Sequence, residues 1–327
     1  MAAVSLVLPC RNEEGHIATC LESLAPQLDV ADELLVVDGQ SDDRTRAIVA
    51  RFAVDDPRIR LIDNPRRHAA AAMNLGIAAA KGEIIVRVDG HSVYPSNYIQ
   101  RLVWSLDAYG ADNVGSSWRI APDVSTPKAR AIATALAHSF GAGTARFRRG
   151  TALARSVDTV PFGCFRRSTF ERLGPFREEL PVNQDDEFNA RLVRGGGTVM
   201  LLPDLEVTYY ARRTIRALWR TYFRYGHFKP LALRLSGRPA TVRQFVPAAW
   251  LMTMTGSVVW SVTAESHIPW TLAWGAYFGA ALSIASRGAW RQRSAAFGSW
   301  FLVACVSMHL AYAVGWWSGV PRAIRRP

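Results

Sequence analysis

The sequence has few cysteines, and it lacks two common glycine-rich motifs. Its 327 residues include four scattered cysteines, too few for a disulfide framework, and Cys10, Cys20 and Cys305 have no metal-ligand spacing. No G-x-G-x-x-G follows the first apolar run, and G-x-x-x-x-G-K-[ST] is absent from the whole sequence. These absences argue against a disulfide-rich domain, a dinucleotide dehydrogenase and a P-loop nucleotidase.

Acidic residues are missing from one long stretch. Lys and Arg total 39 and Asp and Glu total 27, a net charge of +12, while the 49% hydrophobic content excludes a disordered chain. All nine charged residues in the segment 211–243 are basic. The net charge alone is compatible with binding to nucleic acid, to an anionic membrane or to a phosphorylated substrate.

Charged residues of either sign are then nearly absent. Glu265 is the only one between residues 244 and 286, and there is none between residues 294 and 320. A basic segment followed by long uncharged stretches is typical of a membrane protein rather than a nucleic-acid-binding protein. We expect a membrane domain, 244–327, with spans at about 244–264, 268–286 and 295–319. Buried core helices are the alternative, although three in succession leave little polar surface for a soluble domain.

The distribution of basic residues predicts an orientation in the membrane. The basic segment 211–243 and the loop 287–293 should both be cytoplasmic, which makes this a multi-pass cell-membrane protein with its N-terminal domain on the cytoplasmic side. The basic tail 322–326 then falls outside, which the same rule disfavours, so the third segment either spans the membrane or is re-entrant. Residues 1–8 lack a basic n-region and do not resemble a signal peptide.

Residues 1–210 have the pattern of an α/β domain. Short apolar runs alternate with amphipathic stretches, which predicts a mostly parallel, doubly wound, Rossmann-like sheet. The expected strands are 4–8, 33–37, 58–62 and 83–88, and the expected helices are 14–24, 41–52 and 69–80. Ligands of such sheets bind beyond the carboxyl ends of the strands. The candidate site residues there are Arg11, Asn12, Glu13, Asp38, Asp89 and His91.

Four sequence motifs in order resemble those of the family 2 inverting glycosyltransferases. They are VSLVLPCRNEE at 4–14, LLVVDGQSDDRT at 34–45, GEIIVRVDGH at 82–91 and NQDDEFNARL at 183–192. Within that family the sequence is most similar to succinoglycan-type exopolysaccharide glucosyltransferases, notably in DTVPFGCFR at 158–166 and in the acidic motif. The resemblance covers roughly residues 4–210 and implies a GT-A fold.

The resemblance also implies a UDP-sugar donor and a role for each strand end. Asp38 would accept a hydrogen bond from the uracil N–H, while Glu13 and the backbone from Pro9 through Arg11 and Asn12 would bracket the nucleoside. Asp89 would reach the ribose or a divalent metal. Because hard oxygen ligands and phosphates suit Mn²⁺ or Mg²⁺, either ion could stabilise the departing diphosphate.

The sequence departs from the family pattern at two positions. His91 occupies the second Asp of the D-x-D motif, where it is a metal ligand, a diphosphate contact or a structural histidine. Gln184 occupies the Glu of the acidic motif. An inverting transfer needs a carboxylate to deprotonate the acceptor hydroxyl. Counting back from Arg191 favours Asp185 for this role over its neighbour Asp186.

The basic segment 211–243 is expected to be an amphipathic interfacial helix. Arg212, Arg216, Arg220 and Arg224 recur every four residues and would share one helical face, interleaved with aromatic residues. That face would bind anionic membrane lipids, or the diphosphate of a lipid-linked acceptor. The resemblance also places Cys164 in the region that faces the acceptor, where we interpret it as a small packing residue.

These observations favour a membrane-bound enzyme that adds a single sugar, for which we expect glucose, to a polyprenyl-diphosphate-linked oligosaccharide. The Q-x-x-R-W motif of processive synthases is absent, which disfavours a polymer synthase. A polyprenyl-phosphate glycosyltransferase is one alternative, and a non-catalytic sugar-nucleotide-binding or scaffold subunit of an export complex is another. No nucleic-acid partner is expected.

Overall fold

A computed structural model describes residues 2–143, 145–148, 152–237 and 242–325. The chain divides into two compact units, Met1–Arg119 with Arg146–Tyr209, and Ile120–Ala145 with Tyr210–Pro327. The change of unit at Tyr209 lies next to the expected domain end at residue 210. The segment 120–145, which the sequence pattern had placed in the first domain, groups instead with the C-terminal helices.

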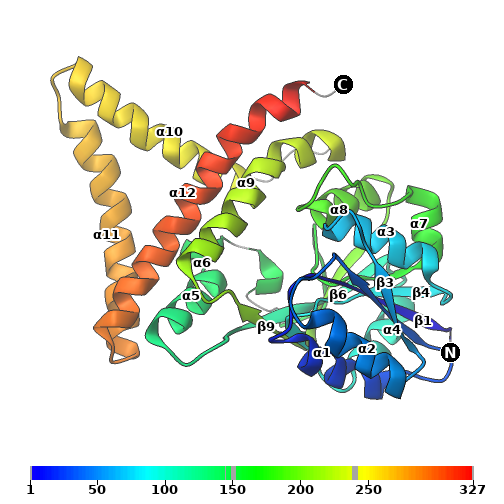
Figure 1. Ribbon diagram of the computed structural model, residues 1–327. Coiled ribbons are helices and arrows are strands. Elements are labelled where there is room, and N and C mark those ends of the chain that lie inside the picture. The colour runs from blue at the N-terminus through cyan, green and yellow to red at the C-terminus, as the bar shows by residue number, and fades with distance from the viewer. Residues whose placement is uncertain (1, 144, 149–151, 238–241, 326–327) are drawn as a thin grey trace. The chain divides into compact units, whose positions relative to one another are not determined.

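The first half of the sheet in the N-terminal unit is parallel, as predicted (Figure 1). Its strands, in spatial order, are β3 (Ile59–Asp63), β2 (Glu33–Asp38), β1 (Val4–Cys10) and β4 (Ile84–Arg87). Every residue of β2 is buried and β1 is nearly so, which explains the continuous apolar runs, since parallel strands are covered on both faces. The register pairs Cys10 with Asp38, so the polar residues after these strands emerge at one edge.

The second half of the sheet is antiparallel, so the sheet is mixed rather than mostly parallel. The order continues from β4 through β8 (Cys164–Arg166), β6 (Asn113–Pro122), β9 (Val199–Ala211) and β5 (Ser92–Val93), and β7 (Arg155–Ser156) pairs with β9. β4 with β8, β6 with β8 and β5 with β9 are antiparallel pairs. Strand–helix alternation marks parallel crossovers, which only the first four strands use.

Helices cover both faces of this sheet. The core of one face includes residues of α1 (Ile17–Leu24), α2 (Thr45–Asp55) and α4 (Tyr98–Ala108). The core of the other face includes residues of α3 (Ala69–Ala79), α7 (Arg167–Leu173) and α8 (Gln184–Arg194). Leu6 and Leu8 belong to the first core and Val7 to the second, as the alternation of side chains along a strand requires. Two 3₁₀ turns, Ala25–Gln27 and Arg146–Arg148, complete the unit.

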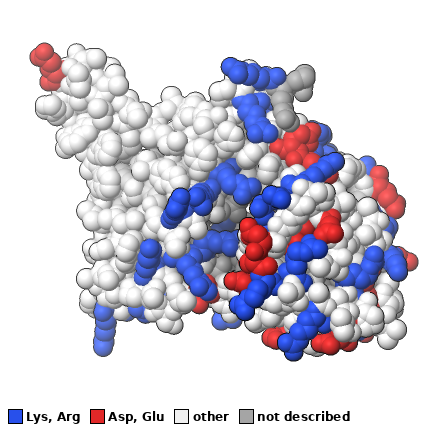
Figure 2. All heavy atoms as spheres, viewed as in Figure 1, with Lys and Arg blue, Asp and Glu red and all other residues white. Residues whose placement is uncertain are grey.

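The second unit is helical. It contains α5 (Pro127–Ala137), α6 (Ser139–Ala142), α9 (Ile215–Ser236), α10 (Val242–Thr263), α11 (Ile268–Arg291) and α12 (Ala295–Arg325). In the part of the chain that the structure describes, two helices are long and apolar enough to cross a membrane, over Gln244–Thr263 and Ala295–Arg325. They correspond to the first and third expected spans, and the first helix ends one residue before the expected boundary at 264. On the face shown in Figure 2, α10 and α11 carry almost no charged side chains.

The expected second span, 268–286, forms a helix but is not one of these two. It lies within the 24 residues of α11, whose sequence contains three tryptophans, three glycines and two serines. These residues give less favourable transfer into hydrocarbon than leucine, isoleucine or valine. Length and composition therefore support two candidate spans, and the prediction of three was too high by this measure.

Helices α9 and α12 of this unit approach each other through glycines. A Cβ atom built on Gly226 would lie 2.1 Å from the carbonyl oxygen of Tyr312, and one on Gly315 would lie 2.2 Å from that of Phe223. Only glycine permits such close contact between helix backbones. α12 is also tied to its neighbours by His309, whose Nδ1 lies 2.8 Å from the Tyr277 hydroxyl and whose Nε2 lies 2.6 Å from the Phe140 carbonyl oxygen.

Candidate active site

Two loops meet beyond the carboxyl ends of β1 and β2. The Asn12 N–H donates to the Ser41 hydroxyl at 2.9 Å, and the Glu13 N–H donates to the Thr45 hydroxyl at 2.8 Å. In return, the Asn12 side-chain oxygen accepts from the Asp42 N–H at 3.0 Å. These bonds connect the two loops, and helix α2 consequently begins at Thr45 rather than at Ser41. Of the other expected nucleoside contacts, Pro9 lies within β1 and Arg11 is exposed just after it.

Asp38 does not have the exposure that a contact to uracil needs. It is completely buried, and its carboxylate accepts from the Ser41 N–H at 3.0 Å, the Ser41 hydroxyl at 2.5 Å and Arg46 at 2.8 Å. Both oxygens are therefore used inside the protein. The expected direct role is corrected to an indirect one, because Asp38 holds the loop that in turn binds the backbone of Asn12.

Asp89 and His91 form a charged pair just after β4, in which His91 is buried. Their carboxylate and imidazole Nδ1 are 2.6 Å apart, and a Glu13 oxygen lies 3.4 Å from the same nitrogen. Burial alone would raise the pKa of Asp89, but His91 and Arg87 lower that pKa to about 2. Burial opposes the charged form of His91, yet Asp89 raises the pKa of His91 well above its usual value. Asp89 is ionised at neutral pH and retains 23% side-chain exposure.

This pair fits a divalent ion only in part. Among the residues described, no group of three or more His, Cys, Asp and Glu side chains could hold a metal ion. The Nδ1 atom of His91 faces Asp89, and the residue is only 6% exposed, so its present contacts do not fit the expected role as a metal ligand. Asp89 does fit, since Mg²⁺ often binds one protein carboxylate together with substrate phosphates.

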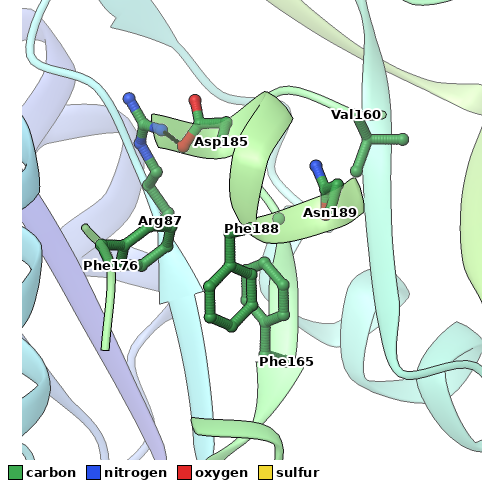
Figure 3. Close-up of a pocket in the computed structure, with 8 residues that line it drawn as sticks. Arg87, Val160, Phe165, Phe176, Asp185, Phe188 and Asn189 are labelled. Carbon is green, nitrogen blue, oxygen red and sulfur yellow. Dashed lines mark hydrogen bonds and ion pairs between the residues drawn. The ribbon is translucent and has the colours of Figure 1, made fainter. Parts of the chain in front are cut away.

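The acidic motif places Asp185 next to a strand of the sheet (Figure 3). Asp185 lies in the first turn of α8, after Asn183 in the left-handed conformation, and forms an ion pair with Arg87 of β4. Both line a small pocket whose wall includes Phe176 and Phe188. Burial, Asp186 and Asp89 raise the pKa of Asp185, and the Arg87 guanidinium counteracts part of that rise. Asp186 is not among the residues that line this pocket.

The third acid of the motif has a structural role. Glu187 is completely buried and forms ion pairs with Arg177 at 3.2 Å and with Arg191 at 3.1 Å. One turn after Asp185, the Asn189 side chain accepts from Asn113 of β6 at 2.7 Å and donates to the Thr159 hydroxyl at 3.0 Å. Helix α8 is therefore fixed to the sheet by contacts that do not involve Asp185.

Arg87 lines this pocket beside Asp185, although the sequence pattern predicts no role for it. It lies inside the third motif. The available signal was a basic residue in an otherwise apolar strand, two residues before the motif's Asp, because buried arginines are almost always paired.

The structure places Cys164 in the core and Arg212 outside the helix that was expected to carry it. Cys164 is completely buried in the sheet core, so it cannot contact an acceptor and is the packing residue that its size suggested. Arg212 precedes α9, which begins at Ile215, and so does not share its helical face. Arg216, Arg220 and Arg224 are exposed on α9, opposite the buried Leu218, Tyr222 and Gly226.

Comparisons with known proteins agree with this geometry. The family model described as Glycosyl transferase family 2 matches residues 5–174, just over half of the chain. The chain is 30% identical over 315 residues to the succinoglycan biosynthesis protein ExoA of Rhizobium meliloti, covering 95% of this chain and 93% of that relative.

A more distant relative and a solved structure extend the comparison. The dolichyl N-acetyl-alpha-D-glucosaminyl phosphate 3-beta-D-2,3-diacetamido-2,3-dideoxy-beta-D-glucuronosyltransferase of Methanococcus voltae is 24% identical over 247 residues, which cover 72% of this chain and 75% of that protein. The mannosyltransferase PcManGT from Pyrobaculum calidifontis, solved with GDP-Man and Mn²⁺, has a TM-score of 0.56 at 19% identity and covers 93% of this chain and 86% of its own. The chain therefore belongs to glycosyl transferase family 2, and it is a glycosyltransferase with the GT-A fold that its motifs predicted.

Proposed function

We propose that the protein is a membrane-bound inverting glycosyltransferase with Asp185 as its general base. It adds one sugar, glucose from UDP-glucose, to a polyprenyl-diphosphate-linked oligosaccharide during exopolysaccharide or cell-surface glycan synthesis. The observation that carries this proposal is the position of Asp185, a partly exposed carboxylate beside Arg87 at the end of β4 and in the pocket wall. Similarity to a succinoglycan biosynthesis protein over nearly the whole chain supports the pathway class.

The chemistry is a single displacement at the anomeric carbon of the donor. The acceptor hydroxyl attacks this carbon, Asp185 takes the hydroxyl proton, and the bond from the carbon to the nucleoside diphosphate breaks with its electron pair leaving on the diphosphate oxygen. General-base catalysis of this kind contributes about 10²–10⁴-fold to the rate. Asp186 is the rival base on the same turn of α8.

The nucleotide would bind beyond the carboxyl ends of β1 and β2. Glu13 and the backbone from Pro9 to Asn12 would bracket the nucleoside, and Asp38 would act through the loop that it holds. Asp89 would hold Mn²⁺ or Mg²⁺ together with the donor diphosphate. When bound, such an ion supplies Lewis-acid stabilisation of the leaving group.

The acceptor would reach the enzyme from a membrane. The two apolar helices α10 and α12 are the candidate spans, and Arg216, Arg220 and Arg224 form a basic, exposed face on α9. Each basic residue close to an anionic membrane surface contributes about 1 kcal/mol to binding. By the distribution of basic residues the glycosyltransferase unit lies on the cytoplasmic side. The Methanococcus voltae relative is named for transfer to a lipid-linked saccharide phosphate, which supports a lipid-linked saccharide as acceptor here.

A transfer assay with several donors tests the proposal. Membranes containing the full chain are incubated with radiolabelled UDP-glucose, UDP-galactose, UDP-GlcNAc or GDP-mannose, each with Mn²⁺, and with lipid-linked oligosaccharide or bare polyprenyl phosphate. We expect label from UDP-glucose in the lipid-linked oligosaccharide. Label in bare polyprenyl phosphate would contradict the proposed acceptor, a lipid-linked oligosaccharide. Transfer from GDP-mannose alone would contradict the proposed donor, UDP-glucose.

A further inference from the structure

Arg87 is a buried cation to which the proposed chemistry gives no role. The three residues before it in β4, Ile84, Ile85 and Val86, are at most 1% exposed. Its own side chain is only 12% exposed, and its guanidinium forms an ion pair with Asp185. An unpaired charge at such a position is strongly unfavourable. The ion pair of Arg87 with Asp185 is therefore required to bury Arg87 and is not a chance surface contact.

The sheet fixes the backbone of Arg87. Its N–H donates to the carbonyl oxygen of Gly163 at 2.9 Å, and the next residue, Val88, donates to Val7 at 3.0 Å. Arg87 is the last residue of β4, and Asp89 follows it by two residues, outside the strand. One short segment of the chain therefore connects the proposed base to the proposed diphosphate site.

The contact is not needed to hold helix α8 in place. Glu187 with Arg177 and Asn189 with Asn113 already attach α8 to the rest of the unit. The first turn of the helix is also closed by its own backbone, because the Asn183 carbonyl oxygen accepts from the Glu187 N–H at 3.1 Å. The Arg87 guanidinium therefore acts on the orientation of the Asp185 carboxylate itself.

We propose that Arg87 is a positioning residue that orients the carboxylate of Asp185, in preference to that of Asp186, toward the acceptor hydroxyl. The inference rests on the proposed function, since it assumes that Asp185 is the base. The Arg87 guanidinium is a planar, rigid group that donates to Asp185 through one of its nitrogens, whereas a lysine ammonium is a point charge on a flexible stem. Lysine at this position would preserve the charge and part of the orientation, and methionine would preserve neither.

Steady-state kinetics of Arg87→Met and Arg87→Lys in the full chain test the inference, with UDP-glucose as donor and lipid-linked oligosaccharide as acceptor. We expect Arg87→Met to lower kcat about 100-fold, the size of loss that misplacement of a catalytic group by ~1 Å causes, with the donor KM within twofold of wild type. Arg87→Lys should recover part of kcat. The matched control is Arg101→Met, which breaks the ion pair between Arg101 and Asp204 at 2.7 Å in the same unit and should leave kcat unchanged.

Other results would overturn the inference. A higher donor KM with unchanged kcat in Arg87→Met would make Arg87 a donor-binding residue. A lower melting temperature in Arg87→Met, with Arg87→Lys no more active than Arg87→Met, would reduce its role to fold stability. Asp185→Asn is assayed in parallel: if it retains turnover, the proposed base is wrong. If it is inactive while Arg87→Met keeps full turnover, only the positioning role fails.

Discussion

At the scale of single residues, the molecule uses its carboxylates in two ways. Asp38 and Glu187 are completely buried and occupied by protein donors, so they shape the loop and the helix around the site. Asp89 and Asp185 keep 23% and 33% side-chain exposure next to cationic partners. Partial exposure beside a positive charge is what a carboxylate needs to remain ionised and still reach a ligand.

The pH dependence of transfer follows from the surroundings of Asp185. Burial raises the pKa of Asp185. The nearby charges of Asp186 and Asp89 raise this pKa further, and the Arg87 guanidinium counteracts part of the rise. A general base works only when deprotonated, so kcat should fall as the pH drops through a pKa above the ordinary value of ~3.9. A pH–rate profile between pH 4 and 8, with melting temperatures as the stability control, should place the acid limb above that value. An acid limb at or below the ordinary carboxyl pKa would exclude Asp185, in this environment, as the general base.

At the scale of secondary-structure elements, one buried acid holds the start of the sheet together. Glu33, the first residue of β2, accepts from the Ser5 hydroxyl of β1 at 2.7 Å, the Lys81 N–H before β4 at 2.6 Å and Arg60 of β3 at 3.1 Å. Its contacts thus reach all four parallel strands or their connections. This network fixes the register that brings the functional strand ends to one edge.

Glu33→Gln should therefore destabilise the protein, with a characteristic pH dependence. Burial would raise the pKa of Glu33, but hydrogen bonds from Ser5, Lys81 and Arg60 lower it overall. A lowered carboxyl pKa stabilises the fold above the unfolded-state value of ~4.3, and this stabilisation is lost as the pH falls through the folded-state pKa. Lost charged hydrogen bonds cost about 1.5–3 kcal/mol each.

The measurement is the melting temperature of wild type and Glu33→Gln between pH 3.5 and 7.5. The difference in melting temperature between wild type and Glu33→Gln should have its full size above about pH 5 and should become smaller below pH ~4.3. Glu206→Gln is the control, because its pair with Arg119 is more than half exposed and should contribute 0–1 kcal/mol. A difference for Glu33→Gln that does not change with pH would contradict the charged network.

At the scale of the whole molecule, a glycosyltransferase unit is joined to a helical unit with two candidate membrane spans. Within the helical unit, the basic helix α9 does not stand alone, because its glycine contacts place it directly against α12. The exposed arginines of α9 are thus carried on a helix that is packed against a candidate span.

Gly315→Val tests the importance of this packing. A Cβ at Gly315 would meet the Phe223 carbonyl oxygen at 2.2 Å, so the two helices would have to separate. Overpacking of this kind costs about 1–3 kcal/mol, and the melting temperature of the full chain in detergent should fall. Gly275→Val in α11 is the control, because a Cβ there meets nothing within 4 Å. Equal melting temperatures for the two variants would show that the α9–α12 contact is loose.

Features that depend on neighbours in the sequence could be predicted, and features that depend on contacts between distant residues could not. The parallel strands and their helices were predictable because each crossover leaves a local strand–helix pattern. The antiparallel strand β8 and the grouping of residues 120–145 with the C-terminal helices were not, since both depend on contacts distant in sequence. The third motif and the acidic motif predicted Asp89 and Asp185 as site residues, but the ion pair of Asp38 with Arg46 and that of Arg87 with Asp185 appear only in three dimensions.

The most direct test of the central claim is Asp185→Asn, assayed for transfer and for nucleotide binding in the same preparation. Transfer from UDP-glucose should fall at least 100-fold, the lower range of general-base catalysis, while UDP with Mn²⁺ should still raise the melting temperature as in wild type. Asp186→Asn, the neighbouring carboxylate, is the matched control and should retain most of the activity. Near-wild-type turnover in Asp185→Asn, with loss of activity in Asp186→Asn, would contradict the account.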